Sequence, residues 1–196
     1  MTSVYLVRHG ETDYNKKGCY YGWTDCSLAQ EGIEQSEVLR STFFNIEYDV
    51  MISSDLKRAV ETANIIKGSS KALLIDKRLR ELNFGKWEGK SYKEVETAYP
   101  DHWNLWIEDY VNAAPTEGES FMTMYNRVSQ CMDEMLDRYK DKSLVIVSHN
   151  GSLRVIAAYL LGLPLDKTWC FNFDHGKYSL LEVNEGHCHI KGINNI

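Results

Sequence analysis

Arg8 and His9 are the first residues in the chain whose types and spacing could do chemistry together. They directly follow residues 4–7, a short apolar run that is typical of a buried strand, and a flexible Gly10 comes next. An arginine offers a planar fork that matches phosphate oxygens, and an imidazole offers a nucleophilic nitrogen at neutral pH. The segment indicates a phosphate site, although an Arg-His pair alone is more often a simple surface feature.

A second histidine lies at the end of a second apolar run, in the segment Val147-Ser148-His149-Asn150-Gly151. Since a helix is predicted to follow, the backbone N–H groups of Asn150 and Gly151 could bind an anion at the helix N-terminus. In open α/β sheets, ligands bind beyond the carboxyl ends of the strands. We therefore expect both histidines to face one crevice, the alternative being two unrelated core histidines.

Two further strand ends carry charged residues that could join this crevice. Arg58 follows the strand-like run 49–53 and lies in the first turn of a predicted helix. Glu81 follows another short strand and could donate a proton to a leaving alcohol. The alternatives are that Arg58 is a solvated helix residue and that Glu81 belongs to a surface salt bridge.

The elements that must position these residues alternate between strand and helix, which predicts a parallel sheet with helices on both faces. Strands are predicted at 4–7, 49–53, 72–75, 144–148, 178–183 and 187–190, and helices at 28–44, 55–67, 119–140 and 152–161. The last two strands form a hairpin that is expected to add an antiparallel edge. Ser27 and Gln30 have the spacing of a capping box, and Gly68 is expected to end the second helix.

Residues 84–115 break the alternation, because this segment is rich in aromatic residues and has no clear strand. The aromatic residues are Phe84, Trp87, Tyr92, Tyr99, Trp103, Trp106 and Tyr110. We interpret the segment as a small helical cap over the sheet edge, inserted in a single domain that spans residues 1–196. The alternative is a satellite hydrophobic cluster without any ligand role.

The composition is that of an ordinary globular protein, with 43% hydrophobic and 26% charged residues. A net charge of −6 argues against a nucleic-acid partner. No transmembrane span and no signal peptide are expected from the hydropathy pattern, which favours a cytoplasmic protein without a membrane partner. The five cysteines are scattered without a C-x-x-C pair, which favours free thiols in a reducing compartment.

Metal chemistry is not expected from this sequence. A metal hydrolase would place several acidic ligands near its histidines, and no such spacing is found. His187 and His189 lie two residues apart on a predicted strand, so both should occupy one solvated face. The sequence assigns no role to His102 or His175.

Five segments, taken in order along the chain, resemble the signature of the histidine phosphatase, or phosphoglycerate-mutase-like, superfamily. They are Leu6-Val7-Arg8-His9-Gly10-Glu11-Thr12, Gly22-Trp23-x-Asp25-x-x-Leu28, Ser53-Ser54-Asp55-Leu56-x-Arg58-Ala59-x-x-Thr62-Ala63, Leu79-Arg80-Glu81-x-x-Phe84-Gly85-x-Trp87-Glu88-Gly89 and Val147-Ser148-His149-x-Gly151. One such motif would be weak evidence, but several in the right order, from about residue 4 to 161, are specific.

The resemblance implies a three-layer α/β/α fold around a mixed, mostly parallel six-stranded sheet. It also implies that His9 is phosphorylated during turnover and that Glu81 is the general acid, then the base for the attacking water. The implied phosphate pocket consists of Arg8, Asn15, Arg58 and His149. No cofactor and no metal are implied, because cationic side chains take the place of the metal.

Within the superfamily, the run Phe84-Gly85-Lys86-Trp87-Glu88-Gly89 resembles the short phosphatases, and among them the α-ribazole 5′-phosphate phosphatases of cobalamin biosynthesis. A flat benzimidazole riboside could stack on an aromatic cap. The alternatives are a broad-specificity sugar-phosphate phosphatase, a cofactor-dependent phosphoglycerate mutase, and a phosphate-binding regulatory module without catalysis. The expected partner is a small-molecule phosphate ester, and both a monomer and a homodimer are compatible with the sequence.

Overall fold

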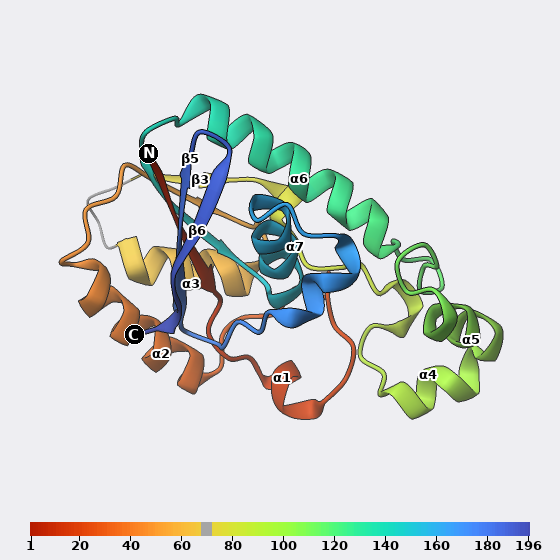
Figure 1. The fold of residues 1–196 in the computed structure, drawn as a ribbon. Coiled ribbons are helices and arrows are strands. Elements are labelled where there is room, and N and C mark those ends of the chain that lie inside the picture. Colours follow the sequence, from red (N-terminus) through yellow and green to blue (C-terminus); the bar gives the residue numbers. More distant parts are fainter. Residues whose placement is uncertain (68–71) are drawn as a thin grey trace.

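The computed structural model contains a six-stranded sheet in the order β3-β2-β4-β1-β5-β6 (Figure 1). The structure describes residues 1–67 and 72–196. The strands are β1 Thr2–Arg8, β2 Val50–Ser53, β3 Leu73–Ile75, β4 Ser143–Ser148, β5 Tyr178–Asn184 and β6 His187–Asn195. The pairs β1–β4, β4–β2 and β2–β3 are parallel, whereas β5 is antiparallel to β1 and to β6. The predicted mixed, mostly parallel sheet is therefore confirmed.

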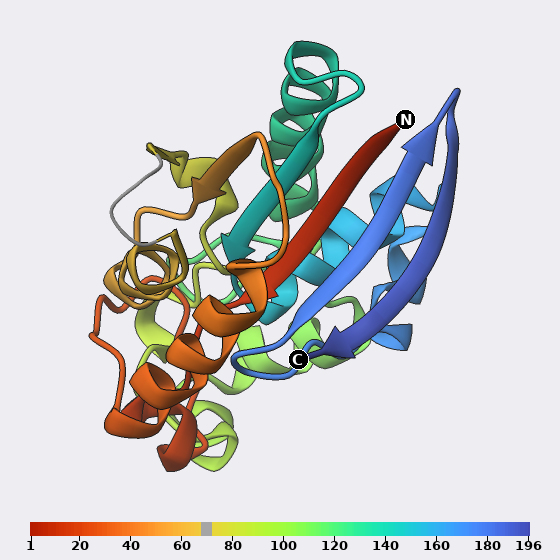
Figure 2. The ribbon, with the colours of Figure 1, turned by 90° about the vertical axis from the view of Figure 1, so that its left-hand side faces the viewer.

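Helices cover both faces of the sheet, because successive apolar residues of the central strands point to opposite sides. On one face, α2 (Gln30–Phe43) and α3 (Lys57–Lys67) pack against Val7 and Val147. On the other face, α6 (Phe121–Arg138) and α7 (Asn150–Leu160) cover the sheet. Figure 2 shows α2 in front of the strands and α7 behind them. The predicted three-layer α/β/α fold is confirmed.

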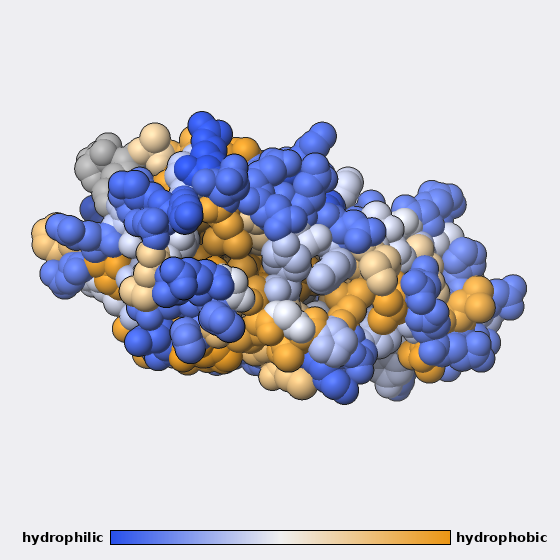
Figure 3. Space-filling view, turned by 45° about the horizontal axis from the view of Figure 1, so that its top comes forward, coloured by the Kyte–Doolittle hydropathy of each residue, from blue (hydrophilic) through white to orange (hydrophobic). Residues whose placement is uncertain are grey.

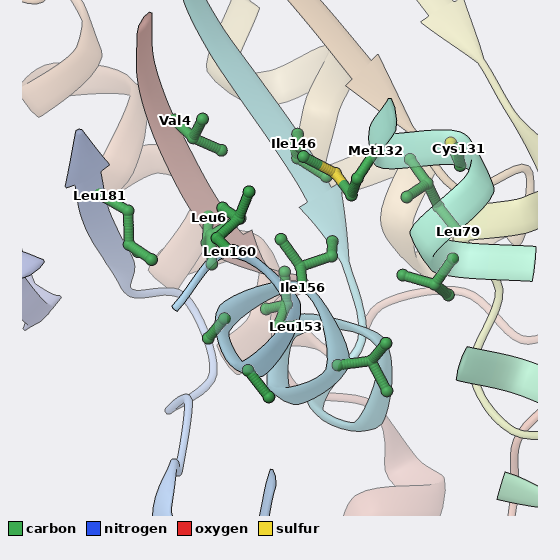
Figure 4. Packing of buried hydrophobic residues seen from close by; sticks show 14 of the residues in the cluster. Val4, Leu6, Leu79, Cys131, Met132, Ile146, Leu153, Ile156, Leu160 and Leu181 are labelled. Carbon is green, nitrogen blue, oxygen red and sulfur yellow. The ribbon is translucent and has the colours of Figure 1, made fainter. Parts of the chain in front are cut away.

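The larger of the two core clusters joins the sheet to α6 and α7 (Figure 4). Val4, Leu6 and Ile146 of the strands are fully buried there, together with Leu153 and Ile156 of α7. The long helix predicted at 119–140 is present as α6, and its buried residues are Phe121, Met124, Val128, Cys131, Met132 and Met135. This packing fixes α7, and hence the residues at its N-terminus, against the ends of β1 and β4.

Residues 84–115 form a helical lobe at one end of the molecule (Figure 1). The lobe contains a single 3₁₀ turn, η2 Gly85–Trp87, then α4 Tyr92–Ala98 and α5 Pro100–Glu108. The Trp87 ring is fully buried, and its centroid lies 5.9 Å from that of Trp103 and 5.7 Å from that of Trp106. This segment is helical without a strand, as expected, and its assignment as a cap within a single domain stays a prediction.

The start of α2 differs from the sequence-based expectation. The helix begins at Gln30 with Ala29 as its N-cap residue, and no side chain caps it, so the capping box of Ser27 and Gln30 was wrong. The N–H of Ala29 instead donates to the backbone carbonyl of Glu11 at 2.9 Å. A tertiary contact therefore takes the place of the local cap. Gly68, expected to end α3, lies outside the described residues.

The surface carries no sign of a membrane span. No described helix is both long enough and apolar enough to cross a bilayer. On the face shown in Figure 3, apolar residues show through in patches between many hydrophilic ones. Individual apolar side chains at a protein surface are ordinary, since polar residues alone cannot cover it.

Candidate active site

The carboxyl ends of β1, β2 and β4 bring the two predicted histidines to one place. Beyond the strands, the His9 N–H donates to the Ser148 carbonyl at 3.0 Å, and the Ser54 N–H donates to the Val147 carbonyl at 3.0 Å. The rings of His9 and His149 consequently lie 5.1 Å apart, measured between centroids. Both side chains are almost fully buried at this edge of the sheet.

One hydrogen bond decides which nitrogen of His9 is free. Its Nδ1 lies 2.7 Å from the Gly10 carbonyl oxygen, and because a carbonyl only accepts, Nδ1 carries the proton. The neutral ring then keeps its lone pair on Nε2. Burial and the nearby positive charge of Arg58 hold the pKa of His9 well below its usual value. His9 is thus an uncharged imidazole whose Nε2 can act as a nucleophile.

Arg58 is buried at the start of α3, which excludes the solvated position considered from the sequence. Its Nη1 donates to the Thr24 carbonyl at 2.9 Å, and its Nη2 donates to the Gly22 carbonyl at 2.6 Å. Its Nε donates to Nδ1 of His149 at 3.2 Å. The Tyr21 ring lies 4.8 Å from the guanidinium carbon, within cation–π range. These contacts fix the plane of the guanidinium.

His149 is held in a neutral form by its two neighbours. Because its Nδ1 accepts from Arg58, its Nε2 carries the proton and donates to the Ser54 hydroxyl at 2.9 Å. Burial and the charge of Arg58 lower the pKa of His149 well below its usual value. His149, which is the N-cap residue of α7, therefore orients Arg58.

The Arg8 side chain leaves part of its hydrogen-bonding capacity unused. Its Nη1 donates to the Phe173 carbonyl, whereas its buried Nε has no hydrogen-bond partner among the described residues. Burial lowers the pKa of Arg8 from its ordinary value. A buried, unpartnered N–H on a cation is costly unless something accepts from it. An anionic ligand at this point would supply the missing acceptor.

Glu81 is held between two backbone N–H groups. Its Oε1 accepts from Leu82 at 2.9 Å, and its Oε2 accepts from Gly151, also at 2.9 Å. A Cβ at position 151 would lie 2.2 Å from Oε1 of Glu81, so this approach requires glycine. The Gly151 N–H, which we expected to bind an anion, is thus engaged with the carboxylate. Glu81 also borders the cavity, which fits a proton donor better than a surface salt bridge.

A cavity of about 450 Å³ opens beside these residues. Its polar lining residues are Arg8, Glu81, Asn150, Gly151 and Arg154. Its aromatic lining residues include Tyr20, Phe84, Trp106, Tyr110, Phe121 and Trp169. This volume lies in the range of small-molecule sites, and the mixed lining predicts a ligand with a charged group and a flat, apolar group.

The structure adds residues that sequence reasoning missed. His175 donates from Nδ1 to the backbone carbonyl of His9 at 3.1 Å, and burial lowers its pKa to about 4. Arg154 of α7 stacks on Trp169, with 4.7 Å from the guanidinium carbon to the ring centroid. His175 and Trp169 lie outside the strands and α-helices and carried no recognisable pattern, so only the folded chain reveals them.

Asn15 and Asn150 are engaged with other parts of the protein. Oδ1 of Asn15 accepts from the backbone N–H and the hydroxyl of Thr12, at the start of the short helix α1 (Asp13–Lys17). Oδ1 of Asn150 accepts from the Phe173 N–H at 3.1 Å, and this residue also lines the cavity. Their roles as phosphate donors stay predictions.

The remaining histidines lie away from this site. His102 is exposed on α5, and His187 and His189 are exposed on the edge strand β6. Within the described ranges, no group of three or more His, Cys, Asp or Glu side chains could hold a metal ion. The charges that surround His9 are instead those of arginines.

Comparisons with known proteins agree with this geometry. A family model described as "Histidine phosphatase superfamily (branch 1)" matches residues 4–196. The adenosylcobalamin/alpha-ribazole phosphatase of Salmonella typhimurium is 33% identical, over 97% of this chain and 95% of that protein. Phosphoserine phosphatase 1 of Hydrogenobacter thermophilus is also 33% identical, over 94% of this chain and 88% of that protein. The crystal structure of the alpha-ribazole phosphatase from Shigella flexneri superimposes with a TM-score of 0.93 at 30% identity, covering 98% and 96% of the two chains.

Proposed function

This chain belongs to the histidine phosphatase superfamily (branch 1), and we propose that it hydrolyses phosphate monoesters through a phosphohistidine on His9, without a metal ion. The observation that carries this proposal is the bond from Nδ1 of His9 to Gly10, which leaves Nε2 unprotonated. Arg8 and Arg58 bring positive charge to this nitrogen, and such charge replaces that of a metal in phosphoryl transfer.

In the first step, the Nε2 lone pair of His9 attacks phosphorus while the ester P–O bond breaks. The phosphoryl group moves to Nε2, and Glu81 donates a proton to the leaving alkoxide. The Nδ1–H bond to Gly10 stabilises the positive charge that develops on the ring. Arg8 and Arg58 stabilise the charge on the phosphoryl oxygens during the transfer.

In the second step, a water molecule attacks the phosphorus atom of the phosphohistidine. The Glu81 carboxylate accepts a proton from this water, the P–N bond breaks, and His9 returns to its neutral form. Inorganic phosphate is the product. The Gly151 N–H holds the carboxylate in place for both steps, and His149 keeps Arg58 aligned.

The aromatic lining of the cavity favours a substrate with a flat ring, and our choice is α-ribazole 5′-phosphate. Its phosphate would lie at Arg8, and its benzimidazole would stack among Trp106, Tyr110 and Trp169. Each aromatic pair of this kind contributes roughly 0.5–1.5 kcal/mol beyond the buried area. In this proposal the lobe 84–115 is the cap that supplies part of the wall. The name of the Salmonella relative supports this choice.

A phosphate-release screen in EDTA tests the class and the substrate together. The panel contains α-ribazole phosphate, phosphoserine, several sugar phosphates and 3-phosphoglycerate, each with and without added Mg²⁺. We expect release in EDTA, no gain from Mg²⁺, and the highest kcat/KM for α-ribazole phosphate. Strict dependence on Mg²⁺ would refute the metal-free mechanism. A clearly higher kcat/KM for phosphoserine would refute our choice of substrate and indicate a phosphoserine phosphatase.

The other functions have their own signatures in the same screen. Similar kcat/KM values across the sugar phosphates would indicate a broad-specificity phosphatase. Isomerisation of 3-phosphoglycerate after addition of a bisphosphate primer would indicate a mutase. Binding of phosphate without turnover of any ester would indicate a regulatory module.

We also propose that the enzyme acts in the cytoplasm on a small-molecule ester. All five cysteines are free thiols, which fits a reducing compartment. The net charge of −6 makes a nucleic-acid partner less favourable than a small anionic ester, because the summed negative charge repels a polyanion. Labelling of the thiols in intact cells and after lysis would test the compartment.

A further inference from the structure

The backbone of residues 22–24 lies between Glu88 and Arg58, and these two side chains bind opposite sides of it. The Glu88 carboxylate accepts backbone N–H bonds from Gly22 at 2.9 Å, from Trp23 at 2.8 Å and from Thr24 at 3.1 Å. It also accepts from the Thr24 hydroxyl at 2.6 Å. Arg58 binds the carbonyls of Gly22 and Thr24.

The peptide group between Gly22 and Trp23 joins the two charged side chains directly. Its N–H belongs to Trp23 and donates to Glu88, whereas its carbonyl belongs to Gly22 and accepts from Arg58. Hydrogen bonds in such a chain polarise one another, so the carboxylate makes the carbonyl a better acceptor for the guanidinium. Glu88 thus acts on Arg58 although it does not line the cavity.

Glu88 is itself firmly placed. It directly follows the buried Trp87, its N–H donates to the Gly85 carbonyl at 3.2 Å, and its Oε1 also accepts from the Phe84 N–H at 3.3 Å. Residue 22 must be glycine, since a Cβ there would lie 1.7 Å from the Leu82 carbonyl oxygen. The loop that carries the two carbonyls is therefore docked on residues 82–88, with Glu88 as its anchor.

We propose that Glu88 is a positioning residue that sets the guanidinium plane of Arg58 through the backbone of residues 22–24. The inference rests on the proposed phosphate-binding role of Arg58. Without a carboxylate at position 88, the three backbone N–H groups of residues 22–24 lose their acceptor, as does that of Phe84, and the loop shifts. The carbonyls of Gly22 and Thr24 shift with it, and Arg58 then meets the transferring phosphoryl group in a poorer geometry.

The variant Glu88→Gln tests this proposal, with p-nitrophenyl phosphate as substrate and orthovanadate as a mimic of the transferring group. The amide keeps the size of the side chain but turns an NH₂ toward backbone donors. Because small misplacements of catalytic groups are costly, kcat/KM should fall about tenfold or more. Vanadate affinity, measured by calorimetry, should fall by a similar factor.

The matched control is Glu94→Gln. Glu94 also accepts an N–H and a hydroxyl bond, both from Ser91 at the start of α4, but it is exposed and lies outside the site. Its replacement should leave kcat/KM and vanadate affinity unchanged. Glu88→Asp keeps the charge on a shorter side chain, so it should show an intermediate loss, and it serves if the amide variant does not fold.

A double-mutant cycle with Arg58→Lys separates positioning from general stability. If Glu88 acts through Arg58, then Glu88→Gln should cost much less in the Arg58→Lys background than in the wild type. Equal losses in both backgrounds would overturn the proposal, as would wild-type kcat/KM and vanadate affinity in folded Glu88→Gln or Glu88→Asp. Vanadate affinity needs no turnover, so an inactive wild type would count against the proposed function alone.

Discussion

At the residue scale, His9 is prepared for its role by groups on either side of it. Gly10 fixes the tautomer through its carbonyl, and its own N–H donates to the Thr62 hydroxyl at 3.0 Å. His175 donates to the backbone carbonyl of His9, so the main chain of the proposed nucleophile is also anchored. The ring therefore needs no rearrangement before its Nε2 can meet a phosphorus atom, which is the condition for an oriented attack.

His9→Ala should abolish turnover, because the covalent step requires Nε2. We expect kcat to fall by about 10⁴-fold or more, as is found when an essential nucleophile is removed. Phosphate release measures the rate, and mass spectrometry after an alkaline quench detects the phosphoryl group on the wild-type enzyme. His102→Ala, which removes an exposed histidine of α5, is the control and should behave as wild type. A wild-type rate in His9→Ala would refute the mechanism.

At the scale of elements, the first turn of α7 binds the loop before the lobe, because the Gly151 N–H donates to the Glu81 carboxylate at 2.9 Å and the Ser152 hydroxyl donates to the Arg80 carbonyl at 2.6 Å. The Arg127 side chain of α6 supports this loop by donating to the carbonyls of Arg80 and Glu81 at 2.8 and 2.9 Å. Glu119 holds the guanidinium of Arg127 in an ion pair. Glu81 is thus fixed by two helices, because α6 holds its backbone and α7 holds its carboxylate.

Gly151→Ala should lower kcat much more than it lowers the melting temperature. The new Cβ would collide with Oε1 of Glu81, which is the end of a movable side chain and can turn away. Alanine inside a helix is favoured over glycine by roughly 0.5–1 kcal/mol, which offsets part of the cost. We expect kcat to fall about tenfold or more while the melting temperature changes by only a few degrees. A wild-type kcat would contradict the position that we assign to Glu81, and a collapse in melting temperature would show a structural defect instead.

The elements that the sequence predicted well are those with a strong apolar pattern. The spacing of apolar residues in 119–140 predicts α6, and the apolar run in 144–148 predicts β4, because burial selects those residues directly. The start of α2 was missed because Ala29 bonds to the carbonyl of Glu11, a residue that lies far from it along the chain. Capping rules that use only neighbouring residues cannot predict a bond that forms only once the chain has folded.

The site could be predicted in part for the same reason. His9 and His149 directly follow β1 and β4, and Arg58 lies in the first turn of α3, so the pairing of the strands brings these three near one another. Glu81 instead lies in the loop after the 3₁₀ turn Lys77–Leu79 and is placed by its bond to Gly151. His175 and Trp169 come from the irregular stretch between α7 and β5, where no periodicity points to the site. Their contribution depends on how this stretch folds back on β1 and α7.

At the scale of the whole molecule, the site gathers three histidines, the buried His9 and His149 and the half-buried His175, around two arginines. The folded protein keeps these imidazoles neutral, with a pKa of about 4 for His175 and lower-than-usual pKa values for the other two. In the unfolded chain each histidine returns to its ordinary pKa of about 6.5. Between these values the unfolded state binds more protons than the folded state.

Stability should therefore rise with pH across this window, because the free energy of unfolding increases wherever the unfolded state binds more protons. The contribution is fully present above about pH 6.5 and is lost as the pH falls toward 4. We expect the free energy of unfolding to decrease by about 2 kcal/mol or more from pH 7 to pH 5, a range above the usual carboxylate pKa values. Urea denaturation at constant ionic strength, without phosphate, measures this slope.

The variant His175→Asn tests how much of this pH dependence of the free energy of unfolding comes from the histidines at the site. An asparagine can still donate to the His9 carbonyl but does not titrate, so the variant should show a shallower dependence between pH 7 and 5. His189→Asn replaces an exposed histidine of β6 and should keep the wild-type slope. If stability were the same at pH 5 and pH 7, or if both variants had equal slopes, the histidines at the site would not be held neutral by burial and by the arginines beside them.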